Sequence, residues 1–156
     1  MTPQVRERVL DVYRAADAAV ASHKPICQKS GRCCRFTEYG HTLFLSDMEA
    51  EILLDGATIT SSSRDSCPFQ IEGLCTARDQ RPLACRIYFC DVTFQDAMPV
   101  IAEEFNRQLK RIADEVGLPW RYAPLHVFLG ERVGEPAPSE PMTRVALTVV
   151  NHAVKQ

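Results

Sequence analysis

A chain of 156 residues is long enough for one domain with a modest hydrophobic core. Apolar residues form 46% of it and charged residues 24%, a globular balance that argues against intrinsic disorder. The formal net charge of -2 lacks the basic excess of a general nucleic-acid-binding protein, so no nucleic-acid partner is expected.

The distribution of charged residues also bears on location. The first 20 residues carry charges throughout, in place of the apolar region of a secretory signal. No run of the sequence approaches the roughly 20 apolar residues that span a bilayer, so no membrane contact is expected. These features predict a cytoplasmic protein, in a compartment that keeps thiols reduced.

Two segments in the first third of the chain have helical spacing. Residues 3–21 repeat valines on one face, with Thr2 as the expected N-cap and Pro3 in the first helical position. The helix expected at 46–55 begins at Ser46, whose side chain is predicted to form a capping box with the acidic residue three positions later. The acidic residues of this turn are interpreted as helix charges and not as a carboxylate pair: Asp47, Glu49 and Glu51.

Four further segments complete the expected elements. Residues 41–45 have the pattern of a short strand, and 82–88 that of a helical turn. Residues 99–117 place apolar side chains on one helical face. The apolar segment 120–129 is ambiguous in class, and a final segment at 142–154 is expected to be helix or strand.

The predicted fold is therefore a single, mainly α-helical domain over 1–156, a few helices packed around an irregular cysteine-rich metal centre. Residues 23–91 would form the metal-binding core. The helices at 3–21 and 99–117 would support it.

Cysteine is the residue type that indicates chemistry. The chain has seven cysteines, all within residues 27–90, and an odd number in a reducing compartment is poorly explained by disulfides. Soft thiolates select zinc, iron–sulfur clusters or Cu(I). The candidate metal ligands are Cys27, Cys33, Cys34, Cys67, Cys75, Cys85 and Cys90.

The spacing leaves several ligand sets open. The paired C-x2-C knuckles of an ordinary zinc module are missing from the sequence, and seven cysteines exceed the four of one zinc ion or one [4Fe–4S] cluster. Some cysteines are then spectators, the centre is larger, or two sites exist. Which of Cys33 and Cys34 ligates, and whether Cys90 or His23 does, stays open.

The surroundings of the cysteines favour thiolates. Arg81 and Arg86 are the candidate cofactor-binding residues, because positive charge favours the ionised sulfur and would offset the negative charge of a cluster. Gly73 would permit the turn that returns the chain to Cys75. Three residues of the same segment are expected to form an apolar wall at the site: Phe69, Ile71 and Leu74.

Three elements of the sequence, in this order, resemble the YkgJ-like cysteine-cluster family of putative zinc- or iron-chelating domains with a CxxCxxCC signature. They are CQKSGRCCR from Cys27, CPFQIEGLC from Cys67 and RPLACRIYFC from Arg81, and together they include every cysteine. Ser30 replaces the second cysteine of the signature. The resemblance implies metal binding, with an iron–sulfur cluster as the preferred centre.

Three functions follow from this reasoning. The preferred one is an iron–sulfur protein, with a 4Fe–4S cluster and a redox or accessory role beside a protein or redox partner that the sequence does not identify. The first alternative is a zinc-binding structural or partner-interaction module. The second is a metalloenzyme with an open coordination position, for which the sequence indicates neither catalytic residues nor a substrate.

Overall fold

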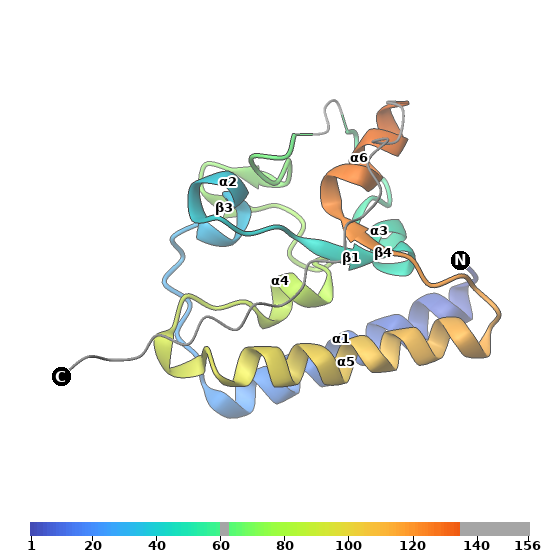
Figure 1. Ribbon diagram of the computed structural model, residues 1–156, viewed down its shortest axis with the longest axis horizontal. Coiled ribbons are helices and arrows are strands. Elements are labelled where there is room, and N and C mark those ends of the chain that lie inside the picture. Colours follow the sequence, from blue (N-terminus) through green and yellow to red (C-terminus); the bar gives the residue numbers. More distant parts are fainter. Residues whose placement is uncertain (60–62, 135–156) are drawn as a thin grey trace, which may run out of the picture.

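The computed structural model describes residues 1–59 and 63–134, and the expected segment at 142–154 lies outside them. The described part is mainly helical, which confirms that part of the prediction. Two long helices lie on one side, and the short strands, short helices and cysteine-bearing loops lie on the other (Figure 1). Within residues 1–59 and 63–134, none of the helices is long and apolar enough to cross a membrane.

The long helices are α1 (Pro3–His23) and α5 (Ala97–Glu115), which run antiparallel and side by side (Figure 1). The Thr2 hydroxyl accepts a hydrogen bond from the Val5 N–H at 3.3 Å, so the predicted N-cap is confirmed. Helix α1 ends two residues later than predicted, because Lys24 adopts the left-handed conformation (φ 51°) that terminates it.

The first hydrophobic core forms where α1 and α5 meet α4 (Leu83–Ile87), the helical turn predicted at 82–88. Leu83 and Ile87 are four residues apart, so both face this core. Cys85 lies between them and packs against the second core instead. One short helix therefore connects the long-helix pair to the cysteine region.

The other side of the molecule contains a two-stranded antiparallel sheet, in which β1 (Phe44–Ser46) pairs with β4 (Tyr122–Pro124). The strand predicted at 41–45 spans 44–46 instead, because only the residues opposite β4 form the pairing hydrogen bonds. The ambiguous segment at 120–129 is divided: β4 comes first, and α6 (Leu125–Val133) begins directly after Pro124.

Helix α3 (Asp47–Leu53) lies between the two cores. Its Met48 and Ile52 belong to the first core, while Ala50 and Leu53 belong to the second. The predicted capping box is present, with the Ser46 hydroxyl bound to the Glu49 N–H and the Glu49 carboxylate bound to the Ser46 N–H.

Candidate metal centre

The cysteines come from three segments, the first two of which are joined by backbone hydrogen bonds. The first contains the 3₁₀ turn η1 (Arg32–Cys34) and continues into α2 (Phe36–Tyr39). The second begins at Cys67, whose N–H donates to the carbonyl of Cys34 at 2.8 Å. The third is α4 and the residues after it, through Cys90. Residues far apart in sequence therefore converge on one region.

The second segment forms a β-hairpin of β2 (Gln70–Ile71) and β3 (Leu74–Cys75). Its two-residue turn has Glu72 at φ 50° and Gly73 at φ 78°, so the predicted glycine turn is confirmed.

The predicted apolar wall is wrong for Ile71, which is 59% exposed and lines neither of the two cysteine-lined cavities, whereas Leu74, equally exposed, lines one of them. These two residues are cross-strand partners on the outer face of the hairpin, whereas the partners Gln70 and Cys75 lie on the inner face. Phe69 does line the cysteine region.

The first of two cysteine-lined cavities, the inner pocket, has a volume of about 30 Å³. The side chains of Leu43, Leu53 and Phe69 form part of its largely apolar wall, and Arg81 is its charged residue. Its cysteines are Cys33, Cys34, Cys67, Cys75 and Cys85.

The second cavity, the outer pocket, has a volume of about 70 Å³ and opens beside the hairpin. Ser30, the residue that replaces a cysteine of the CxxCxxCC signature, places its hydroxyl 3.7 Å from the Cys90 sulfur. The outer pocket shares three cysteines with the inner one, so all seven line one or the other. Its cysteines are Cys27, Cys33, Cys34, Cys75 and Cys90.

The sulfurs are gathered but not arranged as ligands. Within residues 1–59 and 63–134, no three His, Cys, Asp or Glu side chains already stand at metal-binding geometry. The sulfurs of Cys33 and Cys34 are 3.9 Å apart, far beyond the roughly 2.05 Å of a disulfide, and all seven cysteines are free. The donor chemistry fits a soft metal, and coordination would require side-chain rotation.

Burial and contacts between thiols raise the pKa of three cysteines of the inner pocket. Burial raises the pKa of Cys85, and the nearby charge of Arg81 opposes this only in part. The contact with Cys34 raises the pKa of Cys33, and burial adds to it. For Cys34 the hydrogen bond with Cys33 lowers the pKa, but the contact with Cys67 and burial outweigh it and raise the value to about 12. A metal bound here would therefore have to displace protons.

The two candidate arginines have different surroundings. Arg81 lines the inner pocket and donates from Nε to the carbonyl of Arg78 at 3.1 Å. Arg86 donates to the carbonyls of Arg81 and Asp79 at 2.8 and 2.6 Å and forms an ion pair with Asp17 at 2.6 Å. Arg86 lines neither cysteine pocket, and its bonds to these two carbonyls hold the loop that carries Arg81.

The candidate histidine His23 packs against the Phe94 ring, with ring centroids 5.4 Å apart, and lines neither thiol pocket. Phe94 belongs to the 3₁₀ turn η2 (Val92–Phe94). His41 is closer to the cysteines: its Nε2 lies 3.3 Å from the carbonyl of Cys33, and its ring stacks on Tyr88.

Glu49 has a role beyond the predicted capping box that the sequence did not indicate. It is 1% exposed, so it is more than a first-turn helix charge. One carboxylate oxygen accepts hydrogen bonds from the Ser46 N–H and hydroxyl, and the other accepts from the Leu83 N–H, each at 2.8 Å. Glu49 thus anchors the N-terminus of the helix that carries Cys85. Its apolar neighbours Met48 and Ala50, beside the capping box, were the available signal.

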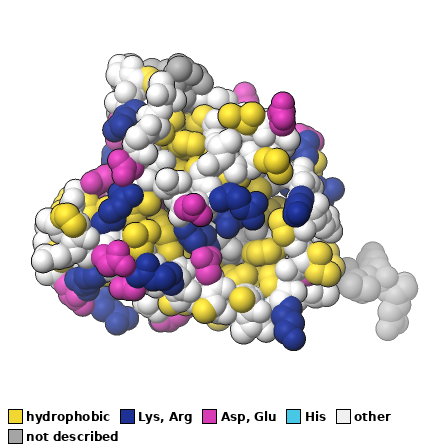
Figure 2. All heavy atoms as spheres, turned by 180° about the vertical axis from the view of Figure 1, so that it is seen from behind, with side chains coloured by type: hydrophobic (Ala, Val, Ile, Leu, Met, Phe, Trp, Pro, Cys, Tyr) yellow, Lys and Arg dark blue, Asp and Glu magenta, His cyan; other side chains and the backbone are white. Residues whose placement is uncertain are grey.

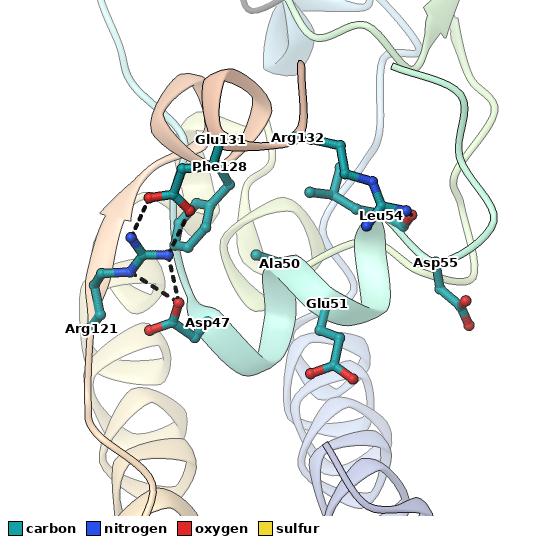
Figure 3. Close-up of a pocket in the computed structure, with 9 residues that line it drawn as sticks. All are labelled: Asp47, Ala50, Glu51, Leu54, Asp55, Arg121, Phe128, Glu131 and Arg132. Atoms are coloured by element: carbon teal, nitrogen blue, oxygen red, sulfur yellow. Dashed lines mark hydrogen bonds and ion pairs between the residues drawn. The ribbon is translucent and has the colours of Figure 1, made fainter. Parts of the chain in front are cut away.

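A larger open groove of about 360 Å³ lies away from the cysteines, between α3 and α6 (Figure 3). Arg121 forms ion pairs there with Asp47 and Glu131 and lies over the Phe128 ring. Glu51 binds the N-terminal amine and Asp55 pairs with Arg6. Its four carboxylates are therefore all paired with cations, and these ion pairs cross-link neighbouring elements.

Comparison of the chain with protein-family models, with curated protein sequences and with solved structures found no match. The assignment of a function therefore rests on the residues and their geometry.

Proposed function

We propose that this chain binds a metal through cysteine thiolates. The observation that carries the proposal is that all seven cysteines, from three separate segments, line two adjoining pockets that share Cys33, Cys34 and Cys75. Thiolates collected behind apolar side chains are the ligand set of iron–sulfur clusters and of structural zinc. The resemblance of the same three segments to the YkgJ-like family supports this class.

An iron–sulfur cluster is the preferred centre, with a redox or accessory role. More than four cysteines are available, and Arg81 beside them would offset part of the negative charge of a thiolate-bound cluster. Such a cluster would supply one-electron chemistry when bound. Zinc is the second candidate, because an inner pocket of about 30 Å³ suits a single ion.

The protein would contribute position and charge. Cys67 is tied to Cys34 through the backbone, and Cys85 is held by the α4 turn that Glu49 anchors. Arg81 supplies positive charge at the inner pocket. Rotation of the cysteine side chains would complete the coordination.

The test is the content of iron, zinc and acid-labile sulfide per chain in protein purified without oxygen, with an absorption spectrum. Iron and sulfide in equal amounts with a broad visible band would support the cluster, and zinc without sulfide would support the second candidate. Cys67→Ser should abolish metal retention, whereas Cys90→Ser, outside the inner pocket, should reduce it less. Protein without any metal would refute the proposal.

A further inference from the structure

The cations at the outer pocket have no acidic partner among residues 1–59 and 63–134. Lys29, Arg32 and Arg78 line this pocket, whereas none of its described lining residues is Asp or Glu. None of the three forms a salt bridge with any residue that the structure describes. The nearby Glu72 lies at the tip of the hairpin turn and does not line the pocket.

Elsewhere on the molecule, several opposite charges are paired. Arg8 pairs with Glu115 and Lys110 with Asp114, both along the long helices. On the face shown in Figure 2, basic and acidic side chains are interspersed, with hydrophobic side chains between them. What distinguishes the outer pocket is that three cations line it with no acidic residue among its described lining, in a chain whose net charge is -2.

One of these cations is held in place. The guanidinium groups of Arg32 and Arg35 lie 5.1 and 5.0 Å from the centre of the same Tyr39 ring. Arg35 is compensated by Glu38 at 2.9 Å, and Arg32 has no such partner among the described residues. Stacking on the ring reduces the conformational freedom that Arg32 would lose on binding a carboxylate.

Exposed apolar side chains surround the same pocket. Leu74 and Tyr88 line it and are 59% and 37% exposed, and Ile71 pairs with Leu74 across the hairpin. Ile26, beside Cys27, is 70% exposed. An apolar and aromatic centre with arginines is the composition of protein interfaces.

We propose that this outer rim, formed by Lys29, Arg32, Arg78, Leu74 and Tyr88, docks an acidic segment of a protein partner. Carboxylates of the partner pair with the three cations, and an apolar side chain of the partner covers Leu74 and Tyr88. A recessed pocket between these residues accepts a protruding segment better than a flat bilayer. The surface goes beyond the proposed metal centre, because none of its five residues is a candidate metal ligand.

The test uses a short fluorescent peptide in which glutamates flank a Leu-Phe pair, with its lysine counterpart as the matched probe. Binding is followed by fluorescence anisotropy on the full chain, with and without metal. The glutamate peptide should bind and the lysine peptide should not. Raising the salt from about 0.05 to 0.3 M should weaken binding.

Two charge-reversal pairs locate the surface. Arg32→Glu with Arg78→Glu should weaken peptide binding about tenfold, whereas Arg107→Glu with Arg111→Glu on α5, the same change in net charge, should leave it within about twofold. Leu74→Ser, at an exposed position, should weaken peptide binding without a change in net charge. Circular dichroism and metal content of each variant separate loss of the surface from loss of the fold or the centre.

Absence of glutamate-peptide binding would overturn the proposal, as would an equal loss in the α5 pair. Binding of phosphatidylserine vesicles in place of the peptide would also overturn it. Peptide binding by metal-free protein would support the surface even if the metal proposal failed, and a metal-loaded chain that ignores the peptide would refute the surface alone.

Discussion

Among single residues, the buried Glu49 depends on hydrogen bonds from neighbouring groups. Its carboxylate is buried, and three hydrogen bonds to Ser46 and Leu83 replace its hydration. Close by, the Tyr13 hydroxyl is buried without a hydrogen-bond partner of good geometry among the described residues. Burial raises the pKa of Tyr13, and the charge of Glu49 adds to this.

Glu49→Ala should lower the free energy of unfolding by about 2 kcal/mol or more, because it leaves the buried N–H groups of Ser46 and Leu83 unsatisfied. Urea denaturation measures the effect. The matched control is Glu51→Ala, two residues along the same helix, whose carboxylate binds the N-terminal amine at the surface. That change should stay within about 0.5 kcal/mol, and equal losses would contradict the anchoring role.

The pH dependence of stability should also reflect the burial of Glu49. Burial raises the pKa of Glu49 above its ordinary value of 4.5, so the folded state holds this proton more tightly than the unfolded state. The stability that this shift contributes is therefore fully present at pH values below 4.5, and it is lost as the pH rises through the pKa of Glu49 in the folded state.

Glu49→Gln removes this titration. The free energy of unfolding of the wild type should fall relative to that of Glu49→Gln as the pH rises above 4.5, as measured by urea denaturation at a series of pH values. A difference that stays constant or grows in favour of the wild type with rising pH would contradict the assigned shift.

At the level of elements, the cysteine region depends on a close approach between the first segment and the hairpin. Gly31 has φ 71°, and its carbonyl accepts a hydrogen bond from the Gln70 side chain at 2.9 Å. A Cβ on Gly31 would lie 2.5 Å from Nε2 of Gln70 and 3.1 Å from the carbonyl oxygen of Gly73. Only glycine satisfies both the backbone conformation and this contact.

Gly31→Ala should therefore destabilise the protein more than Gly40→Ala. Gly40 shares the left-handed conformation at φ 64°, but a Cβ there meets nothing within 4 Å. The control should cost about 1 kcal/mol, and Gly31→Ala at least about 1 kcal/mol more, with reduced metal retention. Thermal unfolding and metal content measure both, and equal effects would show that the hairpin contact contributes nothing.

At the level of the whole molecule, the two cores differ in composition. The first, between α1, α4 and α5, contains no cysteine among its described members. The second contains Cys34 and Cys67, with Cys33, Cys75 and Cys85 packed against it. A metal bound by these thiolates would therefore stabilise the second core directly and the first only through α3 and α4.

Removal of the proposed metal by a chelator should affect the two cores unequally. Amide hydrogen exchange should increase most in η1, the β2–β3 hairpin and α4, while the centres of α1 and α5 remain protected. Equal loss of protection in both cores would show that the metal holds the entire fold. Unchanged exchange throughout would contradict a structural role for the thiolates.

Local sequence determined the elements whose stabilising interactions lie within a few residues. The N-cap of α1, the capping box of α3, the glycine turn of the hairpin and the mainly helical class all followed from residue types and their spacing. The clustering of seven cysteines was likewise visible in the sequence. These features need no knowledge of what packs against them.

Only the tertiary structure decided which face of each element is buried and what it meets. It turned Ile71 away from the cysteines, bound Arg86 to backbone carbonyls, and divided the seven thiols between two pockets. It also buried Glu49 against the N-terminus of α4, where its hydrogen-bond partner Leu83 lies 34 residues further along the sequence. Contacts between distant segments determine each of these outcomes, and the local spacing of residues carries no information about them.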